Sequence, residues 1–564
     1  MSLRTVLILG TALLLSSAAH AQWTSDATLN TVIAGGSTDQ LLPKVAPTAD
    51  GGCYVSWYAA AAGPAYWNVR LNRLDASGAA LWGPDGILVS DKANPAPAGS
   101  AVLGATVDYD LKVDSSGNAL IVLTDTRLNT ARDVFAYRVS PAGVHEWSAE
   151  GRTLSNNSNF EKDPRIVQTS DGNYAVVWAR TGSGSVAGRG IMMQRLDSSG
   201  LPQLADGGVL VAGSGVGGVG SNEVADLAEV VASDAGSIVI VYVRDTRTVT
   251  SPRHLYAQKI GPDASRLWNS GSPVVVSDQP LPAPPVTTPR PSVVSDGSGG
   301  VVAAWHDLRA GVGQYNVWVQ RVLGDGSVAY IANGVQASMD ASSAHQDASV
   351  SFDPATGSAT AFWRESDLAL TTFGVSGQSF GSAGARLWGD SGLALKPIGP
   401  QNILLVRSAR QHANTTVVCV SEPGGAGSDV LLGWSVNAAG ATAWTPAQLT
   451  FASTPSGKTV VPVGNLSTVR LPVAILSSGA AVVAWEDARS GNFDVMAQRI
   501  NANGSLGIPV CTADFNGQGG VTVQDIFDFL AAWFVGNAAA DINGSGSVTV
   551  QDIFDFLAAW FAGC

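Results

Sequence analysis

The stretch GGVVAAW at residues 299–305 decides the fold, because variants of it recur along most of the chain. Each copy has a turn rich in Gly or Asn, then apolar residues, then a large apolar anchor, which is the pattern of a short β-strand entered from a tight turn. The other copies are GGCYVSW (51–57), GNALIVL (117–123), GNYAVVW (172–178), GSIVIVY (236–242), GSATAFW (357–363), NTTVVCV (414–420) and GAAVVAW (479–485). Eight copies spaced roughly 60 residues apart indicate a repeat architecture.

Each copy is flanked by further strand patterns. A strand such as residues 164–167 comes before it and one such as residues 494–504 comes after it, and a fourth segment often begins with Leu-Trp, as at residues 81–82. Four short strands joined by turns form one antiparallel sheet, and stacking such sheets around an axis buries both faces of each. The sequence therefore predicts an all-β fold, an eight-bladed β-propeller over residues 22–510, with seven blades or an array of β-sandwiches as alternatives.

The last copy is one strand short. Only residues 505–509 follow it before the composition changes, whereas ATLNTVIA at residues 27–34 is a spare strand pattern that precedes the first copy. We predict that this N-terminal strand, near Val32, completes the blade of Trp485, because ring closure removes an exposed sheet edge.

Polar pairs recur just after the anchors, and we interpret them as structural. A pair repeated in several blades does the same work in each, most simply an Asp–Arg contact that pins a hairpin. The pairs are Asp125 with Arg127, Asp245 with Arg247, Asp307 with Arg309, and Asp487 with Arg489.

The N-terminus has the pattern of a cleavable signal peptide. Residues 1–21 contain Arg4, an apolar run at residues 6–15 and a small-residue site at residues 19–21. We expect export to the extracellular space or cell surface, and no later stretch is apolar for long enough to predict a transmembrane segment.

Four cysteines accompany this prediction of export. Cys511 and Cys564 bracket the end of the chain and are available to pair in an oxidising compartment. Cys53 and Cys419 lie in apolar strand patterns far apart in the sequence, and we interpret them as buried free thiols.

Composition narrows the possible functions. The formal net charge is −13 and no Lys/Arg-rich run is present, which excludes a nucleic-acid partner. The sequence contains neither an H-E-x-x-H motif nor a phosphate-loop motif. It identifies no catalytic residues and leaves enzymatic activity open, with a non-enzymatic role favoured.

The C-terminal segment is a duplication. VTVQDIFDFLAAWF occurs at residues 521–534 and again at 548–561, and each copy overlaps an acidic loop, at residues 514–525 and 541–552. Both loops have the spacing of calcium-binding loops, with oxygen ligands at positions one, three, five, seven, nine and twelve, so we predict two calcium ions as cofactors. The predicted ligands are Asp514, Asn516, Gln518, Gly520, Thr522 and Asp525 in the first loop and Asp541, Asn543, Ser545, Ser547, Thr549 and Asp552 in the second.

A helix follows each loop. Ile526, Phe529, Leu530 and Trp533 recur at helical spacing, as do their copies 27 residues later. Each half is too small to fold alone, so we expect the two to pack together around the ions, with the terminal cysteines holding the ends.

With its starting Cys511 and its final Gly563-Cys564, this segment resembles a dockerin. The resemblance covers residues 511–564 and implies a small all-α module that folds with calcium and docks to a cohesin-like or other surface protein. It also implies partner contacts just after the ninth loop position, at Val523 and Gln524 in one copy and at Val550 and Gln551 in the other. Gln518 and Ser545 depart from the usual Asp at position five, which suggests weaker calcium binding.

Two hypotheses follow for the whole chain. The first is a secreted propeller that acts as a binding or scaffold protein and is attached to an extracellular assembly by the calcium-dependent module. The alternative is a carbohydrate-active hydrolase with its site in the propeller funnel, since the repeats loosely resemble sialidase-like propellers, although that family's S-x-D-x-G-x-T-W box is not present.

Overall fold

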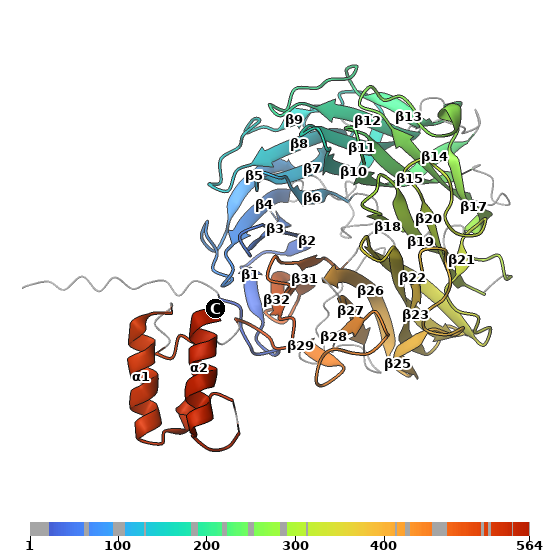
Figure 1. Ribbon diagram of the computed structural model, residues 1–564. Helices are drawn as coiled ribbons and strands as arrows, with labels where there is room; N and C mark the ends of the chain where they lie inside the picture. The colour runs from blue at the N-terminus through green and yellow to red at the C-terminus, as the bar shows by residue number, and fades with distance from the viewer. Residues whose placement is uncertain are drawn as a thin grey trace, which may run out of the picture. The chain divides into compact units, whose positions relative to one another are not determined.

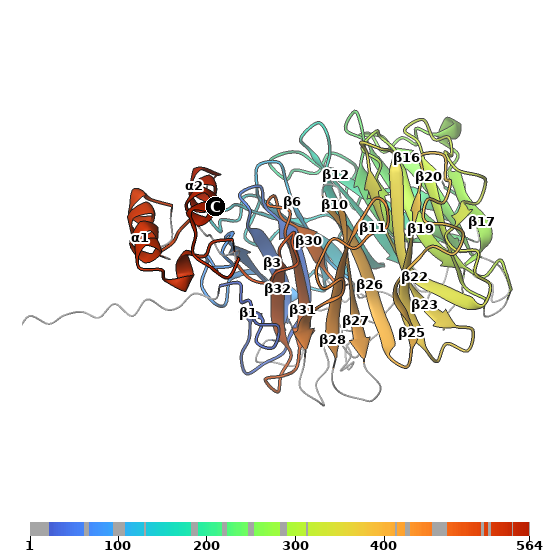
Figure 2. The same ribbon diagram turned by 60° about the horizontal axis from the view of Figure 1, so that its bottom comes forward.

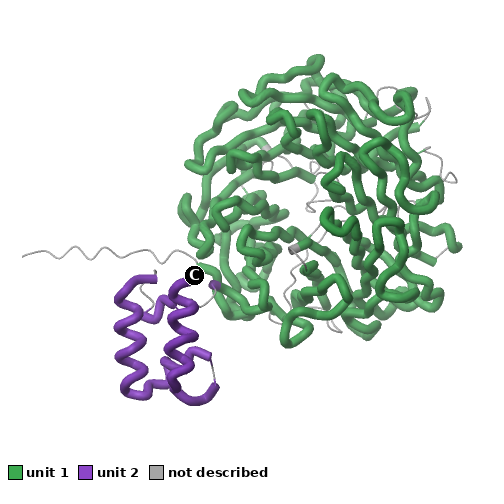
Figure 3. The backbone as a smooth tube through the Cα atoms, viewed as in Figure 1, with its two compact units in different colours: residues 1–507 green, residues 508–564 purple. Residues whose placement is uncertain are grey.

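The computed structural model describes residues 22–60, 67–93, 108–128, 131–181, 190–216, 223–245, 253–281, 290–311, 314–411, 414–422, 429–453, 471–508, 513–516, 521–543 and 545–562. The predicted signal peptide and Arg247, Cys511, Gln518, Gly520 and Cys564 lie outside these residues. By its internal contacts the chain divides into unit 1, residues 1–507, and unit 2, residues 508–564 (Figure 3).

Unit 1 is an eight-bladed β-propeller, as predicted (Figure 1, Figure 2). Each blade is a sheet of four antiparallel strands, and the first strands of the blades contact one another around a closed ring. One bridge, between Ala93 and Asp125, links the first two blades.

The strands of the first seven blades run outward from the ring axis in chain order (Figure 1). The first strands are β2 (Gln40–Pro47), β6 (Asp110–Val113), β10 (Phe160–Gln168), β14 (Val224–Ala232), β18 (Ser292–Ser295), β22 (Ser343–Asp353), β26 (Asn402–Gln411) and β30 (Val473–Ile475). The second strands are β3 (Cys53–Ala60), β7 (Ala119–Asp125), β11 (Tyr174–Thr181), β15 (Ile238–Asp245), β19 (Val301–Asp307), β23 (Ser358–Asp367), β27 (Asn414–Glu422) and β31 (Ala481–Asp487). The third strands are β4 (Trp67–Leu74), β8 (Asp133–Val139), β12 (Gly190–Leu196), β16 (Arg253–Ile260), β20 (Asn316–Val322), β24 (Phe373–Phe380), β28 (Val430–Asn437) and β32 (Asp494–Ile500). The fourth strands are β5 (Ile87–Ala93), β9 (Arg152–Thr153), β13 (Val209–Gly213), β17 (Val274–Leu281), which the short helix η1 (Asn269–Gly271) precedes, β21 (Val335–Gln336), β25 (Leu393–Gly399), β29 (Leu449–Ser453) and, in the last blade, β1 (Thr31–Ala34).

The quoted repeat is the second strand of each blade. In β7, β19 and β31 every residue is buried, because neighbouring blades cover both faces of the sheet. Gly117 and Gly172, in the turns that lead into two of these strands, each have a φ of 81°, a conformation that glycine adopts without strain.

The ring closes through the N-terminal strand. β1 pairs with β32, with Thr31 opposite Ala497 and Val32 opposite Met496. This confirms that a strand from the start of the chain completes the blade of Trp485.

Trp23 adds a second closing contact. In blades two and seven, the indole N–H groups of Trp147 and Trp444 donate to a carbonyl oxygen in the next blade, at 3.2 and 2.9 Å, and each ring packs on a turn glycine there. Trp23 packs in the same way on Gly78 of the first blade, where a Cβ atom would lie 2.8 Å from the indole ring. The N-terminal segment therefore supplies both a strand and a packing contact that the last blade lacks.

The Asp–Arg contacts are confirmed as structural ion pairs in three blades. They join Asp125 to Arg127, Asp307 to Arg309 and Asp487 to Arg489, and each of these carboxylates is fully buried. In the fourth blade Asp245 pairs with Arg253 at 2.9 Å.

Cys53 and Cys419 are buried free thiols, as predicted. Burial raises the pKa of each to about 12, which keeps both thiols protonated and unreactive.

Unit 2 contains helices α1 (Val523–Phe534) and α2 (Val550–Ala562) and the short helix η2 (Ala538–Ala540). Phe529 and Phe556 are fully buried and stack with ring centroids 4.2 Å apart. The indole of Trp533 donates to the carbonyl oxygen of Thr549 at 2.7 Å, and that of Trp560 donates to Thr522 at 2.8 Å. These reciprocal contacts relate the halves by a pseudo-two-fold axis. No helix among the described residues is long and apolar enough to span a membrane.

Candidate functional site

The second loop of unit 2 brings predicted ligand oxygens together. Ser545 Oγ lies 3.3 Å from Asp541 Oδ1 and 3.1 Å from the carbonyl oxygen of Ser547. The backbone N–H groups of Ser545 and Gly546 donate to the Asp541 carboxylate at 2.9 and 2.7 Å, which folds the loop back onto its first residue. Oxygens at positions one, five and seven thus converge from one short segment, as a hard cation such as calcium requires.

The ligand at position three is oriented by a carboxylate that the sequence analysis did not identify. Asn543 Nδ2 donates to Asp555 Oδ2 at 2.8 Å, so the amide oxygen faces the loop, where it accepts the N–H of Ser545 at 3.0 Å. Asn516 and Asp528 make the same contact at 2.8 Å in the first half. An Asp occurs three residues after the twelfth position of both loops, and this repetition could have indicated its role from the sequence.

The residues at position twelve also cap the helices. The N–H and hydroxyl of Thr549 donate to Asp552 Oδ2 at 2.7 and 3.0 Å, and Thr522 and Asp525 make the same pair of bonds. This is a capping box, which fixes where each helix begins. The bond from the Thr549 N–H holds the pKa of Asp552 below its usual range, so this buried carboxylate is ionised.

The described residues contain no group of three or more His, Cys, Asp or Glu side chains that would hold a metal. The predicted sites do not require one, because each loop brings two carboxylates and otherwise amide, hydroxyl and carbonyl oxygens. Such an all-oxygen set suits calcium rather than a transition metal. In the first loop, the predicted ligands that lie within the described residues are Asp514, Asn516, Thr522 and Asp525.

The predicted partner contacts lie on the surface of unit 2. Val523 and Val550 are 58% and 59% exposed, while Gln524 and Gln551 are exposed and donate to Asp528 and Asp555 at 2.9 Å. The rest of this apolar surface was not predicted from the sequence. It continues along each helix four and eleven residues after Val523 and Val550. The further exposed residues are Phe527 and Phe534 on α1 and Phe554 and Phe561 on α2.

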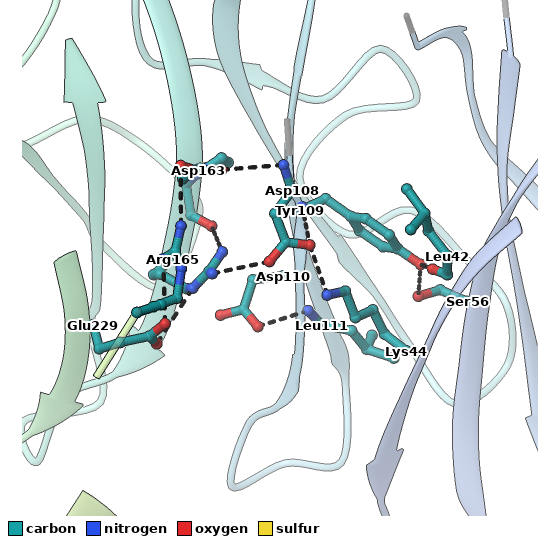
Figure 4. A network of polar contacts seen from close by, with 12 residues as sticks. Leu42, Lys44, Ser56, Asp108, Tyr109, Asp110, Leu111, Asp163, Arg165 and Glu229 are labelled. Carbon is teal, nitrogen blue, oxygen red and sulfur yellow. Dashed lines mark hydrogen bonds and ion pairs between the residues drawn. The ribbon is translucent and has the colours of Figure 1, made fainter. Parts of the chain in front are cut away.

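In the propeller, a chain of buried and half-buried charges crosses five blades, and Figure 4 shows the part around Asp108. Asp108 lies between Lys44 at 2.6 Å and Arg165 at 2.9 Å. Arg165 also reaches Glu229 at 3.5 Å, and Arg290 reaches Glu229 at 3.2 Å. Although burial alone would raise the pKa of Asp108, the adjacent cations Lys44 and Arg165 hold it well below its usual range. A general acid needs a proton near neutral pH, which Asp108 does not hold. Its ion pairs tie neighbouring blades together.

No protein-family model matches the chain, and no curated protein matches it. Among solved structures, Sqt1 from Chaetomium thermophilum is 12% identical, with a TM-score of 0.41 over 83% of this chain and 97% of that one. An endo-arabinase from Bacteroides thetaiotaomicron is 13% identical, with a TM-score of 0.29 over 50% and 92% of the two chains. The GH93 α-L-arabinofuranosidase of Fusarium graminearum is 10% identical, with a TM-score of 0.31 over 62% and 96%. TM-scores this low say nothing about the function of this chain.

Proposed function

We propose that this chain is a secreted β-propeller binding or scaffold protein, attached to an extracellular or cell-surface assembly by a dockerin-like module that binds two calcium ions. The convergence of Asp541, Ser545 and Ser547 oxygens in the second loop is the observation that carries this proposal. When bound, calcium would supply the positive charge that the acidic loops need in order to close.

The exposed face of each helix supports a docking role. Val523, Phe527 and Phe534 form one apolar surface and are 58 to 75% exposed, which is unusual for large apolar side chains of a soluble module. Their copies on α2 form an equivalent surface, so a cohesin-like partner would meet the same contacts in either orientation.

Residues 508–564 contain six Asp residues and no Lys, Arg or His. Repulsion among these carboxylates disfavours the folded module without a counter-ion. With only two carboxylates per loop, we expect calcium dissociation constants on the order of 10⁻⁵ to 10⁻³ M, as in extracellular calcium modules.

The test is calorimetric titration of the full chain with calcium after chelator treatment. We expect binding at two sites, with loss of the second site in Asp541→Ala and no loss in the matched control Asp325→Ala, which alters an exposed propeller turn. Unchanged calcium binding in Asp541→Ala would contradict the proposal. In the same exported protein, a non-reduced peptide map should show Cys511 linked to Cys564, and two free thiols would rule out that clasp.

Among the described residues, Glu486 is a candidate acid for the alternative of a carbohydrate-active hydrolase. Burial raises the pKa of Glu486 to about 8, a value compatible with a general acid. However, Glu486 is only 2% exposed, so a glycan does not reach it in this structure. The binding role is therefore the better-supported function.

A further inference from the structure

Arg165 and Arg407 occupy the same place in blades three and seven. Each is the first residue paired after a bulge in the first strand of its blade. The bulges contain Asp163 and Leu405, with positive φ angles of 51° and 53°. Because the backbone path is the same, the two guanidinium groups project from equivalent points of the ring.

Both arginines pair with an aspartate of the preceding blade. Arg165 Nη2 lies 2.9 Å from Asp108 Oδ2, and Arg407 Nη1 lies 3.1 Å from Asp347 Oδ1. Each also donates Nη1 to the carbonyl oxygen of the residue before it. The first two partners of the two arginines are thus alike.

The third partner differs. Arg165 Nε also reaches Glu229 of the following blade at 3.5 Å. In the blade that follows Arg407, the residue at the matching position is Pro472. Its carbonyl oxygen accepts the N–H of Ala484 at 3.2 Å, and Ala484 directly precedes the anchor Trp485. Glu229 occupies that same register position in its own blade. Proline has no side-chain acceptor, so among the described residues the carboxylate that completes the set around Arg165 has no counterpart at Arg407.

A second guanidinium, from Arg364 in β23 of the preceding blade, interacts with the same aspartate, Asp347. Arg364 Nη2 donates to Gln346 Oε1 at 2.7 Å, and in the described part of the chain this is its one hydrogen bond. The Nε atoms of Arg364 and Arg407 are both buried without a hydrogen-bond partner. The two guanidinium groups therefore hold unused donors.

The local charge is also unbalanced. Asp347 interacts electrostatically with both Arg364 and Arg407 and is the carboxylate common to them. His306 accepts the backbone N–H of Asp347 at 3.3 Å, and burial lowers its pKa to about 4, so it adds no charge at neutral pH. Among the described residues, two cations face one anion. The side chain of Asp347 is 35% exposed and that of Arg407 is 14% exposed, so solvent reaches the edge of the cluster at Asp347.

We propose that Arg407 and Arg364 bind the carboxylate group of a small anionic ligand, which takes the place beside Arg407 that Glu229 takes beside Arg165. A planar carboxylate matches the paired N–H donors of a guanidinium group, and a single negative charge neutralises the excess. This inference rests on the proposed binding role of the propeller and names the ligand class for it.

The experiment measures the thermal midpoint of the full chain in sodium acetate, relative to sodium chloride at the same ionic strength. Because a ligand that binds the folded state raises its stability, we expect a saturable rise in wild type. The rise should disappear in Arg407→Met, with the association constant for acetate about tenfold or more lower. Arg410→Met is the matched control, because this arginine lies on the same strand and pairs with Asp353 at 2.7 Å, outside the cluster; it should respond as wild type does.

Pro472→Glu provides an independent test that keeps both arginines. Its carboxylate should occupy the place of the ligand, so this variant should lose the response to acetate while remaining at least as stable as wild type in chloride. The inference would be overturned if acetate did not raise the thermal midpoint of wild type. It would also be overturned if the response to acetate persisted in Arg407→Met or in Pro472→Glu. The calcium titration tests residues of unit 2, whereas the acetate response tests residues of unit 1. A chain that failed to bind calcium would therefore still respond to acetate, and the two proposals fail independently.

Discussion

Replacing Glu486 with Gln should remove a pH dependence from the stability of the closed ring. Glu486 lies in β31 of the last blade, and its Oε1 accepts the N–H of Leu42 in the first blade at 2.6 Å. Its Oε2 is buried without a hydrogen-bond partner. Burial raises the pKa of Glu486 to about 8, and the charge of Asp39 acts in the same direction. The folded protein therefore holds this carboxyl protonated at neutral pH.

The sign follows from proton binding. A glutamate in an unfolded chain has a pKa of about 4.3. Between that value and 8, the folded chain holds a proton that the unfolded chain has released, so the free energy of unfolding falls as pH rises. The stability is fully present below pH 4 and is lost progressively up to pH 8. At about 1.4 kcal/mol per pKa unit, this group alone lowers the free energy of unfolding by about 3 kcal/mol between pH 4.5 and pH 7.

The assay is urea unfolding of wild type, Glu486→Gln and the exposed control Glu146→Gln from pH 4.5 to 8. Gln has the shape of the protonated acid and does not titrate, so its stability relative to wild type should grow with pH, from near zero at pH 4.5 to about 3 kcal/mol at pH 7. Glu146→Gln should follow wild type throughout. If the profiles of wild type and Glu486→Gln ran parallel, Glu486 would not be held protonated and the reasoning would be refuted.

Three further variants test other contacts of the structure. Trp23→Ala should lower the free energy of unfolding in urea by about 3 to 5 kcal/mol, because it removes the ring that packs on Gly78. Leu81→Ala, at a residue that is 48% exposed, is the control and should lower it little. Equal effects of the two substitutions would contradict the closing role of Trp23. Arg165→Met should lower the free energy of unfolding by about 3 to 5 kcal/mol in the same measurement, because it removes the cation that pairs with Asp108 and Glu229. The control Arg410→Met should lower it by under about 1 kcal/mol. A small loss in Arg165→Met would mean that the network does not stabilise the fold. Asp555→Ala should weaken calcium binding at the second loop by about 10- to 100-fold in calorimetry, because it frees the amide of Asn543; an unchanged affinity would show that the amide needs no orienting.

The sequence predicts what depends on local pattern. The blades were evident because each repeats one turn, one apolar strand and one anchor, and the closing strand was evident because the last repeat lacks one. The bulges at Asp163 and Leu405 were not predictable, since a bulge is defined by its register with a neighbouring strand. Pairs such as Arg165 with Asp108 join residues of different blades, and their separation in the chain carries no signal.

Loop spacing predicts the ligands of the candidate calcium site but not their supporting contacts. It selects Asp541, Asn543 and Ser545, because the ligands of such a loop come from one segment. Asp555 was missed because it lies in the helix, beyond the loop pattern, and Phe554 was missed because its helix face became apparent only once the buried face was known.

A ring of equal blades limits where a specific function can arise. Contacts that recur in several blades, such as the Trp–Gly contact and the Asp–Arg pair, maintain the scaffold and cannot single out one place on it. Specific chemistry has to come from a position where one blade departs from the others, as at Pro472, which leaves Arg407 without the acidic partner that Arg165 has. Unit 2 follows the opposite logic, because both of its helices keep the same sequence, and with it the same exposed side chains. This contrast accords with the two roles that we propose, recognition of one ligand by the propeller and a duplicated docking surface on the module.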